Sequence, residues 1–208
     1  MTRQSTTSVR IVVEALRLFA IHGYRGTRVS DIEGAAGLSP KAGGFYRHFR
    51  SKSEVLEAAL HHYADQATRS EAALDLLPLS DFRSELTLLC RWVLNMMAEQ
   101  RDFIRILHRE GDEFPDLVAQ FHERIVRRGL ELATGFFRLK QKEAGLDLQD
   151  HDPEAIAAVA LGSIINYRVE EAMFGEPPGP VSEERFIKTW VDVWSTYGNN
   201  LVRAGGSG

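Results

Sequence analysis

The residues that can do chemistry gather between Val29 and Phe49, where a short predicted helix, a glycine turn and a second short segment follow one another. The second segment carries small and cationic side chains, which is the pattern of a helix-turn-helix whose second helix enters the major groove of DNA. Hydroxyl, imidazole and cationic groups donate hydrogen bonds to phosphates and base edges. The expected DNA-contacting residues are Arg28, Ser39, Lys41, Ala42, Gly43, Gly44, Tyr46, Arg47, His48 and Lys52.

Different members of this set suit different parts of the duplex. The small residues from Ser39 to Gly44 let the backbone approach the floor of the groove, and Lys41 can reach a guanine acceptor or a phosphate. The Tyr46 hydroxyl and the His48 imidazole are phosphate donors, and Lys52 adds a cation at the start of the next helix, whose N-terminus also attracts phosphate. The alternative interpretation leaves Tyr46 in the core and His48 on the surface.

The charge of the chain is divided unevenly along its length. Residues 1–50 hold eight Lys and Arg against three acidic residues, a net charge of +5, whereas the remainder carries −9 and the whole chain −4. A basic head on an acidic body indicates that only the head meets phosphate. Chance clustering of these residues is the alternative explanation.

Composition places the chain among ordinary globular proteins. Its 208 residues, 44% hydrophobic and 26% charged, suffice for one large or two small domains. The single cysteine, Cys90, cannot form a disulfide within the chain, which favours a reducing cytoplasm. The apolar run from Ile11 to Ile21 contains Glu14 and Arg17, is too short to span a bilayer, and does not read as a signal peptide. We expect a cytoplasmic protein without a membrane segment.

The elements that must position these residues are predicted to be helices. Apolar residues recur at helical spacing and no stretch alternates with the period of a strand, so we expect an all-α fold of about nine helices. A three-helix DNA-binding head would occupy residues 1–60 and a larger helical body residues 61–204, with a flexible tail at 205–208. The expected helices are 9–20, 30–36, a third that opens at Ser39 and Pro40, then 54–77, 81–97, 101–109, 115–143, 153–174 and 182–203.

Four runs of the head follow a family pattern at consistent spacing. These runs are Val12 to Thr27, Asp31 with Ile32, Ala35 to Ser39, and Phe45 to Glu54. Residues 9–60, which contain them, resemble the DNA-binding head of TetR-family transcriptional regulators. The resemblance implies that the third helix enters the major groove and that Tyr46, His48 and Lys52 bind the DNA backbone. It also implies a C-terminal body that dimerises and binds a small ligand, with repression as the commonest mode of action.

The chain departs from that family in the segment from Leu38 to Phe45. This segment is two residues longer than usual, so the resemblance assigns no individual base contact to residues 41–44. The adjacent Gly43 and Gly44 cost on the order of 1–2 kcal/mol of helix stability. We therefore expect the third helix to be partly frayed without DNA.

Side-chain type also predicts the residues that cap the helices. Ser53 is the expected cap of the long fourth helix, and Asp152 caps the helix that starts at residue 153. In the family that the head resembles, a hydroxyl residue often caps the second helix at the position of Arg28. Thr27 or Ser30 must therefore take that role here.

The body offers two helical faces that suit pairing and an aromatic group that suits a ligand. Paired across a two-fold axis, the faces would form a four-helix dimer interface, and the aromatic group would suit an apolar effector. Both sets can instead be the core of one protomer. The candidate interface residues are Val159, Gly162, Ser163, Phe186, Trp190, Val193, Trp194 and Tyr197. The candidate pocket residues are Trp92, Met96, Phe103, Leu107, Phe114, Phe121, Phe136, Phe137 and Ile165.

The expected mechanism couples the two parts of the chain. A dimer would place two third helices roughly 34–36 Å apart on a near-palindromic operator. A small effector bound in the body would move the long fourth helix and release the DNA, and a coupling of about 1–3 kcal/mol would change affinity roughly 5–150-fold.

Two other classes of function stay open. An all-helical metal-dependent enzyme would need clustered ligands, and the sequence offers Glu57 and His61 at a spacing of four residues but no Glu-x-x-His, His-Glu-x-x-His or phosphate-loop motif. An adaptor could keep the helix-turn-helix shape without binding DNA. We expect a regulator, with no catalytic residues, metal or cofactor.

Overall fold

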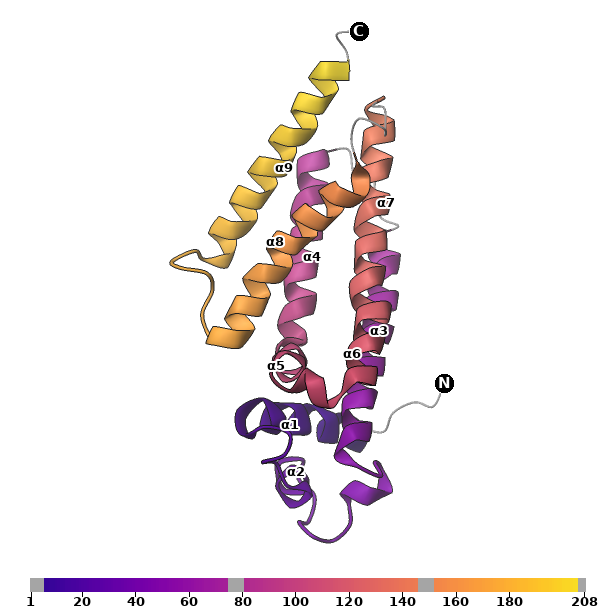
Figure 1. Cartoon of the computed structure of the whole chain (residues 1–208), viewed down its shortest axis with the longest axis vertical. Coiled ribbons are helices and arrows are strands. Elements are labelled where there is room, and N and C mark those ends of the chain that lie inside the picture. The colour runs from indigo at the N-terminus through magenta and orange to yellow at the C-terminus, as the bar shows by residue number, and fades with distance from the viewer. Residues whose placement is uncertain (1–5, 75–80, 146–151, 206–208) are drawn as a thin grey trace. The chain divides into compact units, whose positions relative to one another are not determined.

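The structure, a computed structural model, describes residues 6–74, 81–145 and 152–205 (Figure 1). Within these residues every regular element is helical and no strand is present, so the predicted all-α fold class is confirmed. The α-helices are α1 (Thr6–His22), α2 (Val29–Ala35), α3 (Lys52–Leu74), α4 (Phe82–Glu99), α5 (Arg101–Glu110), α6 (Pro115–Phe121), α7 (Arg128–Glu143), α8 (Pro153–Phe174) and α9 (Glu183–Gly205). The shorter helical turns are η1 (Phe45–Arg47), η2 (Gly111–Glu113) and η3 (His122–Arg127).

Helix boundaries lie close to the predicted ones where local sequence sets them. The Asp152 carboxylate accepts hydrogen bonds from the backbone nitrogens of Glu154 and Ala155, at 2.9 and 3.1 Å, and so caps α8 as predicted. The expected end of the fourth helix near residue 77 and the tail at residues 206–208 lie outside the described residues.

Two expectations about helix boundaries are wrong. The cap of α3 is Ser51, whose hydroxyl accepts from the backbone nitrogen of Glu54 at 3.2 Å, because the helix begins two residues earlier than expected and Ser53 lies inside its first turn. The single helix expected over residues 115–143 is divided into α6 and α7 by the π-helical turn η3. A π-turn adds a residue to the helical repeat and so changes which side chains share a face.

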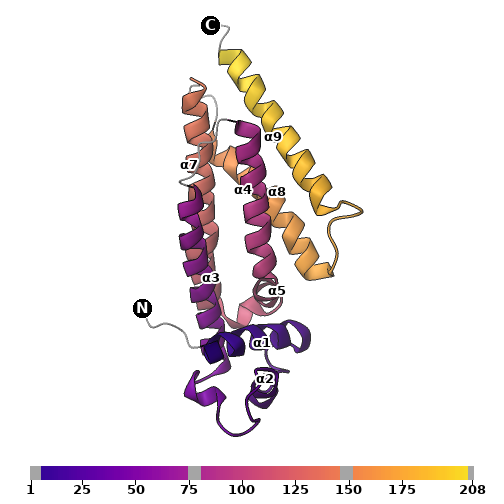
Figure 2. The same cartoon turned by 180° about the vertical axis from the view of Figure 1, so that it is seen from behind.

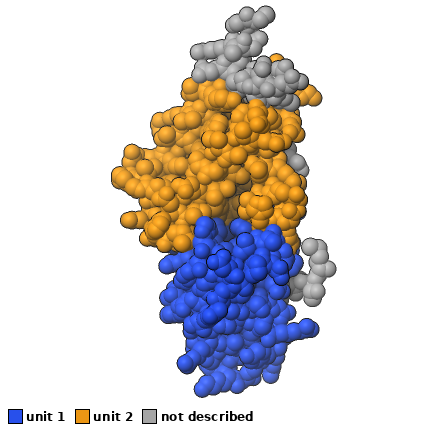
Figure 3. All heavy atoms as spheres, in the orientation of Figure 1, with its two compact units in different colours: residues 1–68, 100–121 blue, residues 69–99, 122–208 orange. Residues whose placement is uncertain are grey.

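The chain forms two compact units, shown in Figure 3. Unit 1 contains residues 1–68 and 100–121, and unit 2 contains residues 69–99 and 122–208. Helices α5 and α6 thus belong with the N-terminal helices, although the sequence places them in the middle of the chain. The domain boundary expected at residue 60 stays a prediction. None of the helices in the described ranges combines the length and the apolar character that crossing a lipid bilayer requires.

Unit 1 is built on the apolar side of α1. Ile11, Ala15 and Phe19 are completely buried, and Ile32 of α2 and Phe45 of η1 are equally buried. Helices α1 and α2 contact each other, and both views show them side by side (Figure 1, Figure 2). Because such short helices are marginal in isolation, this shared core holds them in place.

Unit 2 packs α4 against α9 and α7 against α8. The buried guanidinium of Arg168 on α8 connects three helices: it donates to the carbonyl of Leu94 at 3.0 Å, to Glu171 at 2.6 Å, and to Glu183, the first residue of α9, at 2.7 Å. Burial raises the pKa of the Cys90 thiol on α4 to about 12, so this thiol stays protonated near neutral pH.

Candidate nucleic-acid interface

The loop from Gly23 to Arg28 leads the chain from α1 into α2. The Thr27 hydroxyl donates to the carbonyl of Gly23 at 2.8 Å, so it is used inside the loop. At the start of α2, the backbone nitrogen of Arg28 donates to the Asp31 carboxylate at 3.2 Å. The prediction that Thr27 or Ser30 caps α2 is therefore wrong, because an acid in the first turn reaches back to the residue before the helix.

The segment from Ser39 to Gly44 forms consecutive turns instead of the expected third α-helix. The φ angles of Lys41 and Gly43 are 64° and 72°, both in the left-handed region. An α-helix requires φ of about −63° at each residue, so two left-handed residues interrupt it before it can propagate. Regular structure returns only as the single 3-10 turn η1. The sequence predicts that the paired glycines weaken the third helix until it is partly frayed. In the structure this segment forms no α-helix at all.

The Glu33 carboxylate, which the sequence-based set of site residues lacks, organises this segment. One carboxylate oxygen accepts from the backbone nitrogen of Lys41 at 2.7 Å and the other from that of Phe45 at 3.0 Å. The side chain is buried, with 2% of the residue exposed. The sequence holds a signal for this role, because Glu33 lies between the buried residues Ile32 and Ala36. An acid at a buried position needs polar partners.

Most of the predicted DNA-contacting residues are exposed. Tyr46 is 61% exposed while its ring contacts Phe45 edge-on, with 5.4 Å between the ring centroids. The interpretation of Tyr46 as a core residue therefore does not hold in this structure. Gly44 faces inward, because a Cβ added there would lie 3.3 Å from Leu38. The exposed residues are Arg28, Ser39, Lys41, Ala42, Tyr46 and Arg47, and the partly buried ones are Gly43, Gly44, His48 and Lys52.

Lys52, at the start of α3, directs its ammonium group toward the protein. The group donates to the carbonyls of Tyr24 and Thr27, at 2.5 and 2.8 Å, and lies 4.4 Å from the centre of the Tyr24 ring. Burial lowers the pKa of Lys52, and the nearby Glu110 carboxylate opposes that effect. Lys52 thus holds the loop before α2 in place.

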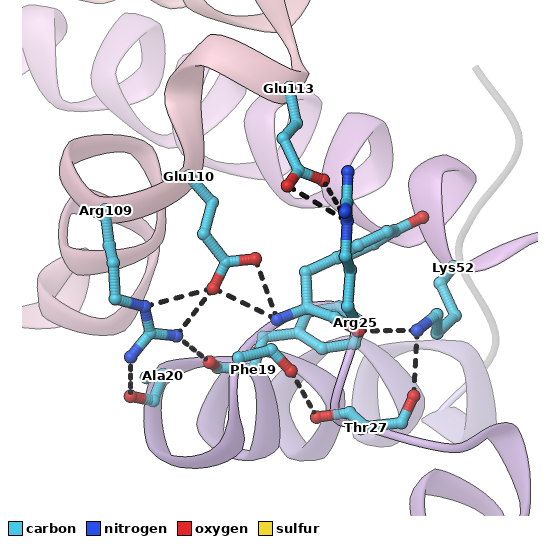
Figure 4. A network of polar contacts seen from close by, with 10 residues as sticks. Phe19, Ala20, Arg25, Thr27, Lys52, Arg109, Glu110 and Glu113 are labelled. Atoms are coloured by element: carbon cyan, nitrogen blue, oxygen red, sulfur yellow. Dashed lines mark hydrogen bonds and ion pairs between the residues drawn. The ribbon is translucent and has the colours of Figure 1, made fainter.

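A second set of contacts connects the end of α5 to the end of α1, as Figure 4 shows. The Arg109 guanidinium donates to the carbonyls of Phe19 and Ala20, at 2.5 and 3.1 Å. The Glu110 carboxylate accepts from the backbone nitrogen of Tyr24 with both oxygens, at 2.9 and 3.1 Å. These carbonyl and amide groups lie at the C-terminal end of α1, where backbone pairing within the helix is incomplete, and the Phe19 carbonyl also accepts from the backbone nitrogen of Gly23 at 2.9 Å. Two consecutive residues of α5 therefore pair the backbone at the end of α1.

The turn after α5 adds further contacts to the same loop. Arg25 forms an ion pair with Glu113 of η2 at 3.0 Å. The Tyr24 ring lies between two aromatic rings, with centroid distances of 5.1 Å to Phe19 and 4.8 Å to Phe114. Burial raises the pKa of Tyr24. The loop before α2 is thus fixed from the side of α5 and η2 as well as by Lys52.

The candidate pocket residues are divided between the two units. In unit 1, Phe103 is completely buried and its ring lies 5.9 Å from that of Phe121. In unit 2, Phe137 is buried between Phe136 and Trp194, with centroid distances of 5.4 and 5.7 Å. The remaining candidates, Trp92, Met96, Leu107, Phe114 and Ile165, are partly buried.

The candidate interface residues divide by exposure. Trp190 is 5% exposed, and its indole N–H donates to the carbonyl of Ala160 and to the hydroxyl of Ser163, at 3.0 and 3.1 Å, so it packs within the protomer. Val159 and Val193 are 66% and 56% exposed, which is unusual for valine. Gly162 and Ser163 are also exposed, whereas Phe186, Trp194 and Tyr197 are partly buried.

Glu57 and His61, the pair considered for a metal site, both lie exposed on α3. Over residues 6–74, 81–145 and 152–205, no three His, Cys, Asp or Glu side chains gather in a group that could hold a metal ion.

Two protein-family models match the chain. The model described as bacterial regulatory proteins of the tetR family matches residues 11–59, and the model of the C-terminal domain of AefR-like transcriptional repressors matches residues 84–197. The first match covers the predicted DNA-binding segment, and the second covers most of the remainder.

Individual relatives agree with these models. TcmR of Streptomyces glaucescens, an HTH-type transcriptional regulator, is 30% identical over 170 residues, which cover 77% of this chain and 71% of TcmR. YuxN of Bacillus subtilis, described as an HTH-type transcriptional regulator, is 30% identical over 130 residues, which cover 58% of this chain. That match spans only 41% of the length of YuxN.

Solved structures share the fold over nearly the whole chain. The fatty acid degradation regulator FadR from Bacillus halodurans gives a TM-score of 0.69 at 19% identity and covers 92% of this chain and 96% of FadR. The structure of AibR in complex with isovaleryl coenzyme A and operator DNA gives 0.64 at 19% identity, with 90% and 97% of the two chains covered. At this level of identity the likeness concerns the fold alone.

The replacement Lys52→Met tests whether Lys52 supports the loop before α2. It keeps most of the aliphatic stem but leaves the carbonyls of Tyr24 and Thr27 without their donor, so we expect the free energy of unfolding to fall by about 1–2 kcal/mol. Urea denaturation followed by circular dichroism measures this loss. The exposed Arg47→Met is the control and should leave the midpoint unchanged. Equal midpoints for wild type and Lys52→Met would contradict this role.

Proposed function

The chain belongs to the TetR family of bacterial transcriptional regulators, and we propose that it is a repressor that binds a near-palindromic DNA operator as a homodimer. A small apolar effector binds the body and releases the DNA. The protein acts in the cytoplasm and has no catalytic activity of its own. In this proposal residues 1–60 bind DNA, and residues 61–204 bind the effector and form the dimer.

The exposed residues between Ser39 and Arg47 support this function most directly. It combines an accessible tyrosine with Lys41 and Arg47, and the rest of the chain has a net negative charge. Tyr46, Arg47, His48 and Arg28 contact phosphates, which position the protein, and the small residues around Lys41 lie against the bases. Carboxylates elsewhere on the chain repel the same phosphates, so the head alone meets the DNA.

Lys52 contributes in a different way from the exposed cations. Its ammonium has three N–H groups, and the carbonyls of Tyr24 and Thr27 take two of them. We assign the remaining N–H to a DNA phosphate near the N-terminus of α3, which itself favours an anion. Lys52 would then join the DNA backbone to the loop before α2.

Contacts between α5 and α1 offer a path by which an effector can act on the head. Arg109 and Glu110 hold the backbone at the end of α1, and Phe103 and Phe121 supply apolar surface in the same unit. An effector that displaces α5 must therefore move the end of α1 or break charge-assisted hydrogen bonds. Either change alters the position of the DNA-binding residues relative to those of the second protomer.

Exposed small and apolar residues on α8 and α9 support the dimer. Val159, Gly162 and Ser163 on α8 and Val193 on α9 are all exposed in the protomer. Small residues let helices from two protomers approach closely, and exposed valines gain free energy when a second copy covers them. Phe186, Trp194 and Tyr197 are partly buried and would complete their burial at the same interface, next to the already buried Trp190.

We expect the protein to select an inverted repeat from a pool of random duplexes, with half-sites about one helical turn apart. A dimer that neutralises roughly six to ten phosphates should lose about 10³- to 10⁵-fold in affinity as salt rises from about 50 to about 200 mM. Fluorescence anisotropy with the selected duplex measures the slope. A protein that binds no duplex at the lower salt concentration would overturn the proposed function and would favour the adaptor interpretation.

An acyl-coenzyme A series is the first probe for the effector, since AibR, a structural neighbour, binds isovaleryl coenzyme A. We expect at least one acyl chain to lower operator affinity roughly 5–150-fold, because the body supplies aromatic apolar side chains. Anisotropy of the operator complex measures the release, and free coenzyme A is the control. Release by free coenzyme A to the same extent would show that the apolar chain is not recognised.

The replacement Val193→Glu should weaken the dimer. An unpaired carboxylate buried between two copies costs about 3 kcal/mol, which raises the dissociation constant roughly 100-fold. Analytical ultracentrifugation measures the constant. Leu139→Glu on α7, where the leucine is 45% exposed, is the matched control and should leave it unchanged. A Val193→Glu protein that stays as dimeric as the control would place the interface elsewhere.

A further inference from the structure

We propose that Glu33 is a positioning residue that determines DNA sequence specificity. Its buried carboxylate holds residues 41–45, which we call the reading loop, in the conformation that faces the bases. This inference rests on the proposed DNA binding and adds to it a residue that makes no contact with DNA.

Residue 33 binds the reading loop and the turn before it at three points. Its backbone carbonyl accepts from the nitrogen of Leu38 at 2.8 Å, and its carboxylate accepts from the nitrogens of Lys41 and Phe45, at 2.7 and 3.0 Å. The carboxylate therefore spans the whole loop, with one oxygen at each end. Hydrogen bonds to an ionised acceptor are about twice as strong as neutral ones, which suits a carboxylate to this task.

The reading loop depends on this support because it is not a helix. In a continuous α-helix the nitrogen of Phe45 would donate to the carbonyl of Lys41, four residues earlier. In the structure that nitrogen donates to Glu33, and Lys41 itself is left-handed with φ of 64°. The left-handed region costs a residue with a side chain roughly 1–2 kcal/mol, so an unsupported loop would relax to other conformations.

The outer side of the reading loop has few packing contacts. Lys41 and Ala42 are exposed, and a Cβ added to Gly43 would meet no atom within 4 Å. On the inner side Gly44 packs against Leu38, next to the Glu33 contacts. Residue 33 thus fixes the loop from within and leaves its outer face free for the base edges.

The contacts of Glu33 should matter most for the DNA sequence specificity of binding. Reading bases requires donors and acceptors at fixed positions, whereas phosphate attraction tolerates disorder. The phosphate-binding candidates Tyr46 and Arg47 follow Phe45 in η1, and the Glu33 carboxylate accepts from the nitrogen of Phe45 and not from theirs. A loop ordered before binding also avoids an ordering cost when DNA arrives. Loss of the carboxylate should therefore reduce specific binding far more than non-specific binding.

The replacement Glu33→Gln tests the inference with little change of volume. An amide has one acceptor oxygen, and its NH2 group cannot accept, so the nitrogen of Lys41 or of Phe45 loses its partner. The probes are the duplex that the wild-type protein selects from a random pool and a scrambled duplex of the same composition. We expect the ratio of the two affinities to fall at least about tenfold, which corresponds to about 1.4 kcal/mol.

Glu14→Gln is the matched control. Glu14 lies on α1, pairs with the exposed Arg17 at 2.9 Å and makes the same change of charge when replaced. Both variants should bind the scrambled duplex alike, and Glu14→Gln should keep the wild-type affinity ratio. A Glu33→Gln protein that is folded by circular dichroism and also keeps the wild-type ratio would overturn the role of Glu33 while leaving the proposed function intact. Failure of the wild-type protein to select any duplex would overturn both.

Hydrogen exchange provides a measurement that needs no variant. The amide hydrogens of Lys41 and Phe45 should exchange more slowly than that of Gly43, because only the former two donate to a buried carboxylate. Equal exchange rates at the three positions would overturn the inference.

If Glu33→Gln does not fold, Glu33→Asp replaces it. The charge stays and the side chain is one methylene shorter, so the ratio of the two affinities should again fall.

Discussion

Backbone N–H and C=O groups at the ends of short elements are the constraint around which unit 1 is built, because a short helix pairs few of them itself. Charged side chains supply the partners: Glu33 for the reading loop, Lys52 for the loop before α2, and Arg109 with Glu110 for the end of α1. A buried group left unpaired costs roughly 1–3 kcal/mol. These charged side chains therefore stabilise the protein's own backbone.

The same constraint separates two kinds of cation in unit 1, which counting charges along the sequence does not distinguish. Lys52 and Arg109 turn toward carbonyls, whereas Lys41 and Arg47 are exposed to solvent. Lys41 and Arg47 are therefore open to solvent, whereas carbonyls already take two of the three N–H groups of Lys52. Lys52 ties the loop before α2 to α3, and Arg109 ties the end of α1 to α5.

Unit 2 shows the corresponding division among apolar residues. Trp190 and Phe137 are buried within the protomer, while Val159 and Val193 remain exposed on α8 and α9. Arg168 connects α8 to α4 and to the start of α9. A second copy that covers these valines, as proposed for the dimer, would gain the free energy of their burial.

The sequence by itself determined the all-helical class, most helix boundaries and the Asp152 cap, because these follow from hydrophobic periodicity and from contacts between near neighbours. It also indicated the family, through the resemblance of the motif residues between Val12 and Glu54. Only the tertiary structure decided that the reading loop is not a helix, that Glu33 supports it and that Lys52 points inward. Each of these outcomes depends on which distant backbone group a side chain reaches. Side-chain spacing along one helix carries no information about such partners, since Lys52 and Tyr24 meet across 28 positions of the sequence.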